Sequence, residues 1–200
     1  ALMFDGINDY ISVPDNNSLD LTTAGTIELW AYKRSNKNYQ MYITKGGEGT
    51  DAYQLMDELD TGSVTLRWGD DATTVTSNSK VPLREWTYIV ATYDGAHANI
   101  YLNGILDNSI DFTTDATANT DPLIIGNRGI ESYYFDGYID STRIYSRALL
   151  SDEILSNYQN SLPANNQTIF TDNFYDNSIS ASWDTTSRGD WVETGGIISL

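Results

Sequence analysis

The sequence predicts an all-β fold, an antiparallel two-sheet sandwich of the jelly-roll type with one short helix. Short runs of strand-forming residues alternate with turn residues along most of the chain, a pattern typical of sandwiches. Aromatic residues, which favour strands, are abundant, with 14 tyrosines and 5 tryptophans among 200 residues. Asp94-Gly95 and Asn103-Gly104 separate consecutive strand-like runs, and such pairs supply the positive φ of tight hairpin turns.

The predicted strands follow one another at short intervals. They span residues 2–4, 10–13, 26–33, 39–44, 53–56, 63–68, 86–93, 99–102, 123–125 and 138–145. Within 26–33, Ile27, Leu29 and Ala31 alternate with Glu28, Trp30 and Tyr32. Since alternate residues of a strand point to opposite faces, the two sets are expected on opposite faces of the sheet.

One helix is predicted after the last of these strands. Ser151 can cap its first turn, and Asp152 and Glu153 suit the positive end of the helix dipole. Ile154 and Tyr158 lie four residues apart and, with Leu155, form an apolar stripe.

A domain boundary is predicted after this helix. We expect one domain over residues 1–162, a linker of proline and polar amides over 163–168, and strand-like segments over 169–200. Because a few isolated strands are marginally stable, the tail must pair with something. It is either the start of a second, similar module, or a strand-donating tail completed by a neighbouring subunit or by the first domain.

The net charge of −17, from 11 basic and 28 acidic residues, argues against binding to nucleic acid or to an anionic membrane. Cysteine is absent, which excludes disulfides and cysteine-bound zinc. No apolar run is long enough for a membrane span.

Several segments share their order and spacing with one family of domains. These are 4–6, 9–11, 26–30, 86–87, 92–95, 100–104, 135–140 and 143–149. The most specific are FDGYID at 135–140 and RIYSRAL at 143–149. Over about residues 1–160 the chain resembles laminin-G-like jelly-roll domains of the concanavalin A-like lectin/glucanase superfamily. The resemblance implies two facing antiparallel sheets, and a module that binds calcium or glycans outside the cell.

Enzymatic activity is not expected. The glucanases of this superfamily place two glutamates around an aspartate on one strand, because glycoside hydrolysis needs a pair of carboxyl groups. Glu58-Leu59-Asp60 is the nearest approach, and no second glutamate follows. The only histidine, His97, follows a predicted turn without an obvious partner.

A calcium site is predicted by the resemblance, in which an acidic group on the first strand meets an aspartate on the last. Asp5 and Asp140 occupy these positions, with the carbonyl of Gly6 as a third ligand. The alternative is that each aspartate caps amides of a turn.

Glycan binding is predicted at aromatic residues in loops. Trp68 precedes Gly69-Asp70-Asp71, and Tyr133 and Tyr134 lie between strands, so Trp68, Asp70, Tyr133 and Tyr134 are the candidates. The other strand tryptophans, Trp30 and Trp86, are expected in the core.

These features together predict a non-catalytic lectin-like module, extracellular or on the cell surface, that binds a carbohydrate or a cell-surface protein and contains calcium. The alternative is a structural subunit of an extracellular filament or surface layer, a homo-oligomer in which a neighbour completes the tail.

Overall fold

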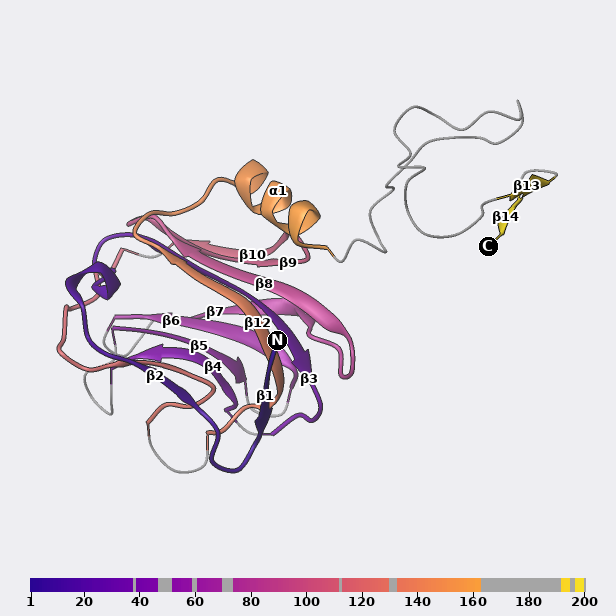
Figure 1. Ribbon diagram of the computed structural model, residues 1–200. Coiled ribbons are helices and arrows are strands. Elements are labelled where there is room, and N and C mark those ends of the chain that lie inside the picture. Colours follow the sequence, from indigo (N-terminus) through magenta and orange to yellow (C-terminus); the bar gives the residue numbers. More distant parts are fainter. Residues whose placement is uncertain are drawn as a thin grey trace. The chain divides into compact units, whose positions relative to one another are not determined.

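In the computed structural model, two six-stranded antiparallel sheets pack face to face over the described residues (Figure 1). The structure describes residues 1–37, 39–46, 52–58, 61–69, 74–111, 113–129, 133–162, 192–194 and 197–199. This arrangement confirms the predicted all-β sandwich with one helix.

The first sheet has the strand order β1-β12-β3-β8-β9-β10. Its strands are β1 (Leu2–Asp5), β12 (Asp136–Tyr145), β3 (Gly25–Lys33), β8 (Trp86–Tyr93), β9 (His97–Leu102) and β10 (Ile105–Asp111). The turns at Gly95, Asn103 and Gly104 have positive φ, as the hairpin signals predict. Strand β10, which the sequence did not predict, continues from the second of these turns.

The second sheet has the strand order β2-β11-β4-β5-β6-β7. Its strands are β2 (Ile11–Val13), β11 (Leu123–Ile125), β4 (Met41–Lys45), β5 (Tyr53–Glu58), β6 (Ser63–Trp68) and β7 (Thr74–Lys80). A short 3₁₀ helix, Asn17–Leu19, follows β2. Strand β7 is polar and carries only two buried residues, which explains why its sequence gave no strand signal.

The core lies between the two sheets. Ile27, Leu29 and Ala31 of β3, which were predicted to share one face, are fully buried there. The core also contains a charged pair. Lys33, at the end of β3, reaches across to Asp57 of β5, with 2.6 Å between Nζ and Oδ2. The Tyr42 hydroxyl donates to the other carboxylate oxygen at 3.0 Å, and the pair links the two sheets.

Helix α1 (Ser151–Ser161) lies on the outer face of the first sheet, next to β8, β9 and β10 (Figure 1). Its Tyr158 ring stacks on Trp30, with 5.8 Å between the ring centres. Beneath the helix, the buried carboxylate of Glu28 accepts hydrogen bonds from Tyr88, Arg143, Tyr145 and Asn157. Trp30 is thus buried under the helix, whereas Trp86 is 42% exposed, contrary to its predicted place in the core.

The two sheets meet along one side, where the edge strands β7 and β10 lie together. The Asp107 carboxylate accepts hydrogen bonds from the backbone amides of Asn78 and Ser79. In addition, the Asn108 side chain donates to the Thr76 carbonyl at 2.7 Å. These contacts close the sandwich on that side.

A second unit begins at the end of α1. The chain divides into Ala1–Asn160 and Ser161–Leu200. In the second unit the described residues form an antiparallel pair, β13 (Val192–Thr194) and β14 (Ile197–Ser199). The predicted linker, 163–168, lies outside the described residues, so the nature of the tail stays a prediction.

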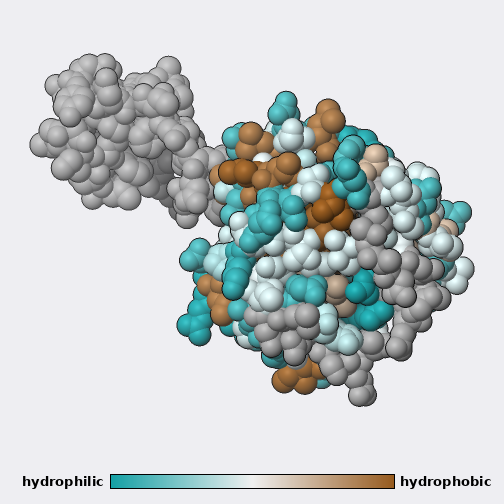
Figure 2. Space-filling view, turned by 180° about the vertical axis from the view of Figure 1, so that it is seen from behind, coloured by the Kyte–Doolittle hydropathy of each residue, from teal (hydrophilic) through white to brown (hydrophobic). Residues whose placement is uncertain are grey.

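The surface is mainly hydrophilic on the face opposite to that of Figure 1. Hydrophobic side chains form small separate patches there (Figure 2). Within the described part of the chain, α1 is too short and too polar to cross a membrane.

Candidate functional site

Asp5 lies at the end of β1 and binds its own turn. One of its carboxylate oxygens accepts hydrogen bonds from the amides of Ile7 and Asn8 at 2.8 and 3.3 Å. The Gly6 carbonyl, predicted as a metal ligand, accepts instead from the Lys37 ammonium at 3.1 Å. The residues around Asp5 therefore serve the turn, which is the alternative that the sequence left open.

Asp140 lies elsewhere on the same strand pair. Asp5 is opposite Asp136, so Asp140 is four residues further along β12, about 13 Å away at 3.3 Å per residue. Asp140 caps the amide of Ser141 at 2.7 Å and forms an ion pair with the amino group of Ala1. The structure therefore does not bring Asp5 and Asp140 together, because the strand register separates them.

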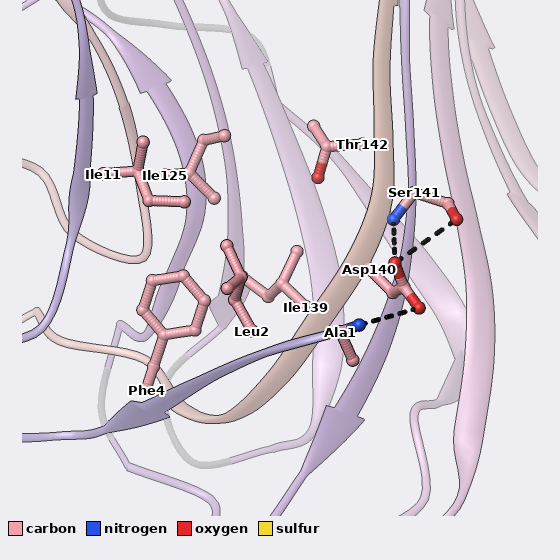
Figure 3. A pocket seen from close by; sticks show the side chains of 9 residues that line it. All are labelled: Ala1, Leu2, Phe4, Ile11, Ile125, Ile139, Asp140, Ser141 and Thr142. Atoms are coloured by element: carbon pink, nitrogen blue, oxygen red, sulfur yellow. Dashed lines mark hydrogen bonds and ion pairs between the residues drawn. The ribbon is translucent and has the colours of Figure 1, made fainter.

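The surroundings of Asp140 are mainly apolar. It lies at the rim of a cleft of about 250 Å³ that opens between the sheets beside β1 and β2 (Figure 3). Leu2, Phe4, Ile11 and Ile139 form much of its lining. Calcium prefers several oxygen ligands, and in this lining only Asp140, Ser141 and Thr142 have side-chain oxygens.

The predicted ligands Asp5, Gly6 and Asp140 therefore do not lie together in this structure. Over the described ranges, no three acidic or histidine side chains gather closely enough to hold a metal. Calcium binding by other groups stays a prediction.

Trp68 is in the core, contrary to its predicted exposure. Its side chain is 1% exposed and packs on Tyr53 and Tyr93, with ring centres 5.5 and 5.1 Å apart. Strand parity explains the error, because Val64 and Leu66 point to the core and Trp68 continues their face. Trp68 cannot stack on a sugar at the surface. Asp70 lies outside the described residues.

The outer face of the second sheet carries a row of side chains that crosses all six strands. The residues are directly opposite one another in the register. They are Ser12, Ile124, Thr44, Gln54, Arg67 and Thr74. Each alternates along its strand with core residues, so the row faces away from the core.

A cavity of about 220 Å³ lies over this row, and we call it the outer-face cavity. It is lined by Tyr39, Met41, Gln54, Met56, Arg67, Arg128 and Tyr133. Strands β4, β5 and β6 supply Met41, Gln54, Met56 and Arg67, and loops supply the rest. Tyr133, one of the predicted glycan-binding residues, thus lies at this cavity.

Gln54 is buried in the outer-face cavity without a hydrogen-bond partner. Its side chain is 0% exposed, and neither the amide nitrogen nor the amide oxygen is paired. Leaving a buried polar group unpaired costs about 1–3 kcal/mol per group. The neighbouring Thr44 hydroxyl is also buried and unpaired. The Gln54 amide, which lines the cavity, therefore has a donor and an acceptor that the described protein does not use.

The walls combine aromatic rings with positive charge. The rings of Tyr39 and Tyr133 meet edge to face, with 5.7 Å between their centres. Tyr39 has φ of 56°, a left-handed conformation that is strained for a bulky residue. Such strain is typical of residues held in place for function. Arg67 and Arg128 provide the positive charge of the lining. The nearby Glu58 is not part of the lining, and its carboxylate accepts a hydrogen bond from the Thr65 hydroxyl at 3.0 Å.

A second cavity, of about 550 Å³, lies toward the other end of the row. Its lining includes Ser12 and Ile124 of the row, together with Tyr10, Asn127 and Tyr134. Tyr134, another predicted glycan-binding residue, follows Tyr133, so adjacent residues of one loop line the two cavities. The outer face can therefore take an extended ligand that crosses the strands.

Sequence reasoning missed most of the outer-face cavity. Gln54 and Arg67 gave a weak signal, since each is a polar residue at an outward position of a strand with buried apolar neighbours. Local sequence does not show that loops cover these positions.

Comparisons with solved structures show a common fold at low sequence identity. Domain 4 of AbnA, an extracellular arabinanase from Geobacillus stearothermophilus, solved with arabinotriose, has a TM-score of 0.64 and 20% identity over 77% of this chain and 74% of its own. A pentraxin of Limulus polyphemus has a TM-score of 0.64 and 11% identity over 80% of this chain and 82% of the pentraxin chain.

The binding domain of Paraclostridial Mosquitocidal Protein 1 also has a TM-score of 0.64, with 17% identity over 79% of this chain. The match spans only 42% of that domain's chain. No curated protein sequence matches significantly. The family model Laminin_G_3, described as the concanavalin A-like lectin/glucanases superfamily, matches residues 5–155. Since this match covers most of the chain and the two sheets have the corresponding architecture, the protein belongs to the Laminin_G_3 family of that superfamily.

Proposed function

We propose that this chain is a non-catalytic, extracellular glycan-binding module, and that an oligosaccharide binds in the outer-face cavity. The unpaired amide of Gln54 is the observation that carries the proposal. A primary amide donates and accepts at once, which suits the hydroxyl groups of a sugar. The Tyr39 and Tyr133 rings provide the apolar contact for the faces of a sugar ring.

The shape of the outer face favours an oligosaccharide over a single sugar. The row of opposing residues connects the outer-face cavity with the larger cavity at Tyr134. Adjacent strands are about 4.8 Å apart, so neighbouring sugar units can contact neighbouring strands. The arabinotriose complex of the structural relative agrees with this class of ligand.

The chemistry of the outer-face cavity supports the proposed absence of catalysis. Hydrolysis of a glycoside usually needs two carboxyl groups on either side of the bond. The described lining of the outer-face cavity contains no acidic residue. We expect bound oligosaccharides to be released unchanged.

The test uses Gln54→Met, which keeps the size of the side chain and removes its polar atoms. Binding of the full chain is first surveyed on a glycan array, and the best oligosaccharide is then titrated by calorimetry. We expect the variant to bind at least about tenfold more weakly, since a hydrogen bond or two is lost. We also expect its melting temperature to equal or exceed that of the wild type, because an unpaired buried amide is removed.

Gln40→Met is the matched control. Gln40 is also 0% exposed, but its amide donates to the Ser35 carbonyl at 2.8 Å and accepts from the Asp136 amide at 2.7 Å. Its replacement should therefore lower the melting temperature. An array without any bound glycan, or full affinity in Gln54→Met, would show that the proposal is wrong.

A further inference from the structure

The outer-face cavity is an exception to the charge distribution of the molecule. The chain has 28 acidic and 11 basic residues, and five of the ten described lysines and arginines form ion pairs with carboxylates. Lys33, Arg34, Lys45, Arg143 and Arg147 all form such ion pairs. The outer-face cavity instead combines two arginines with a described lining that has no acidic residue.

Arg67 differs from these paired cations. It projects from β6 next to Gln54 and is half-buried, yet it forms no ion pair with a described carboxylate. Its Nε is buried without a hydrogen-bond partner. A guanidinium is always charged and presents a planar set of donors that matches a carboxylate. A buried donor on a charged group is costly unless an acceptor meets it.

We propose that the bound glycan carries a carboxylate, as uronic and sialic acid residues do, and that Arg67 binds this carboxylate beside Gln54. The inference rests on the proposed glycan-binding function and specifies its ligand. Arg128 also lines this cavity. Because the net charge of −17 repels anions at long range, recognition must come from these local contacts.

The experiment compares acidic ligands with neutral counterparts, of which the first pair differs only in the carboxylates and the second in the presence of the sialic acid residue. Trigalacturonate is titrated against its neutral counterpart, an α-1,4-linked galactotriose, and sialyllactose against lactose. The first pair tests a uronic acid and the second a sialic acid. Each is titrated into the full-length wild type and into Arg67→Gln and Arg67→Lys. Lys80→Gln, at an exposed position of β7, removes the same charge away from the cavity.

We expect at least one acidic ligand to bind the wild type more tightly than its neutral counterpart. Arg67→Gln should weaken this binding by about 10- to 100-fold, the effect of one charge-assisted hydrogen bond or two. Arg67→Lys should keep part of the affinity, since the charge remains but the planar pair of donors does not. Lys80→Gln should bind like the wild type, and the melting temperatures of the Arg67 variants should be unchanged.

The two proposals fail in different ways. If the neutral ligands bind as tightly as the acidic ones and Gln54→Met weakens both, the glycan-binding function stands and the acidic ligand is wrong. If an acidic ligand is preferred but Arg67→Gln has no effect, Arg67 is not the residue that binds it. Absence of binding by all four ligands overturns the inference, and absence of any glycan on the array overturns the function as well.

Discussion

The ion pair between Lys33 and Asp57 predicts a loss of stability with a defined dependence on pH. Both side chains are buried between the sheets, at 0% and 2% exposure. Lys33→Met keeps the aliphatic chain and removes the charge. The Asp57 carboxylate then remains in the core with only Tyr42 and Gln40 as hydrogen-bond donors.

Two limits set the expected loss of folding stability in Lys33→Met. Breaking a buried ion pair by removing one partner costs about 3–5 kcal/mol. Protonation of Asp57 sets a ceiling on this cost, because a neutral carboxyl no longer needs the ammonium. Its ordinary pKa is 3.8, and each pH unit above that value adds about 1.4 kcal/mol to the cost of holding the proton. The ceiling is therefore about 4 kcal/mol at pH 7 and about 2 kcal/mol at pH 5.

The direction of the pH dependence follows from the pKa of Asp57. Burial raises it in the folded protein, and the Lys33 ammonium and the Tyr42 hydroxyl lower it in part. Lys33→Met removes the first of these opposing effects, so the folded pKa rises further. A raised carboxyl pKa favours folding at low pH, and this contribution is lost as the pH rises through the folded value. The variant should therefore come closer to the wild type as the pH falls from 7 to 5.

The assay is urea unfolding of the full chain at pH 7, 6 and 5, followed by circular dichroism. Lys80→Met, the same substitution at an exposed position, should change the stability by less than about 0.5 kcal/mol. Lys33→Met with Asp57→Asn should recover part of the loss, since no charge is then left in the core. A loss below about 1 kcal/mol at pH 7, or an equal loss at all three pH values, would refute this reasoning.

Three further predictions concern acid stability, calcium and the core. Hydrogen bonds from Arg147 and the Leu150 amide lower the pKa of Glu153 from 4.5 to about 2. The contribution of Glu153 to folding stability is therefore present above about pH 4.5 and is lost as the pH falls toward 2. In acid titrations Glu153→Gln should flatten this part of the curve of stability against pH. Asp5→Ala should lower stability by about 1 kcal/mol through loss of the turn bonds. Melting curves in calcium and in chelator should show the same decrease in melting temperature for this variant. A decrease seen only in calcium would support a metal site at Asp5. Trp68→Ala should cost about 4 kcal/mol, and Trp86→Ala about 1 kcal/mol, in urea unfolding; similar losses would contradict their different burial.

The sequence predicted those parts of the fold that depend on local patterns. Alternation in β3 placed Ile27 and Leu29 on one face of the strand, and the turn at Asp94-Gly95 placed the β8–β9 hairpin. Helix α1 followed from its cap and its apolar stripe. These features need only a few consecutive residues, so no knowledge of distant contacts was required.

The predictions that failed depend on long-range structure. The distance between Asp5 and Asp140 is set by the register of β1 against β12, strands more than a hundred residues apart in the chain. Trp68 was assigned from the turn that follows it, although the parity of β6 places it inside. Gln54 resembles any outward polar residue of a strand until the loops that bury it are known.

The two sides of the sandwich differ in whether another chain can pair with their edge strands. Because Asp107 occupies the amides of Asn78 and Ser79, another chain cannot readily add a strand along this part of β7. The opposite side, where β1 and β2 flank the apolar cleft, has no such barrier in the described contacts. Edge-to-edge pairing through that one side would join two copies about a twofold axis and stop there. A fibre would need a second, different surface, and the sandwich edges alone do not supply one.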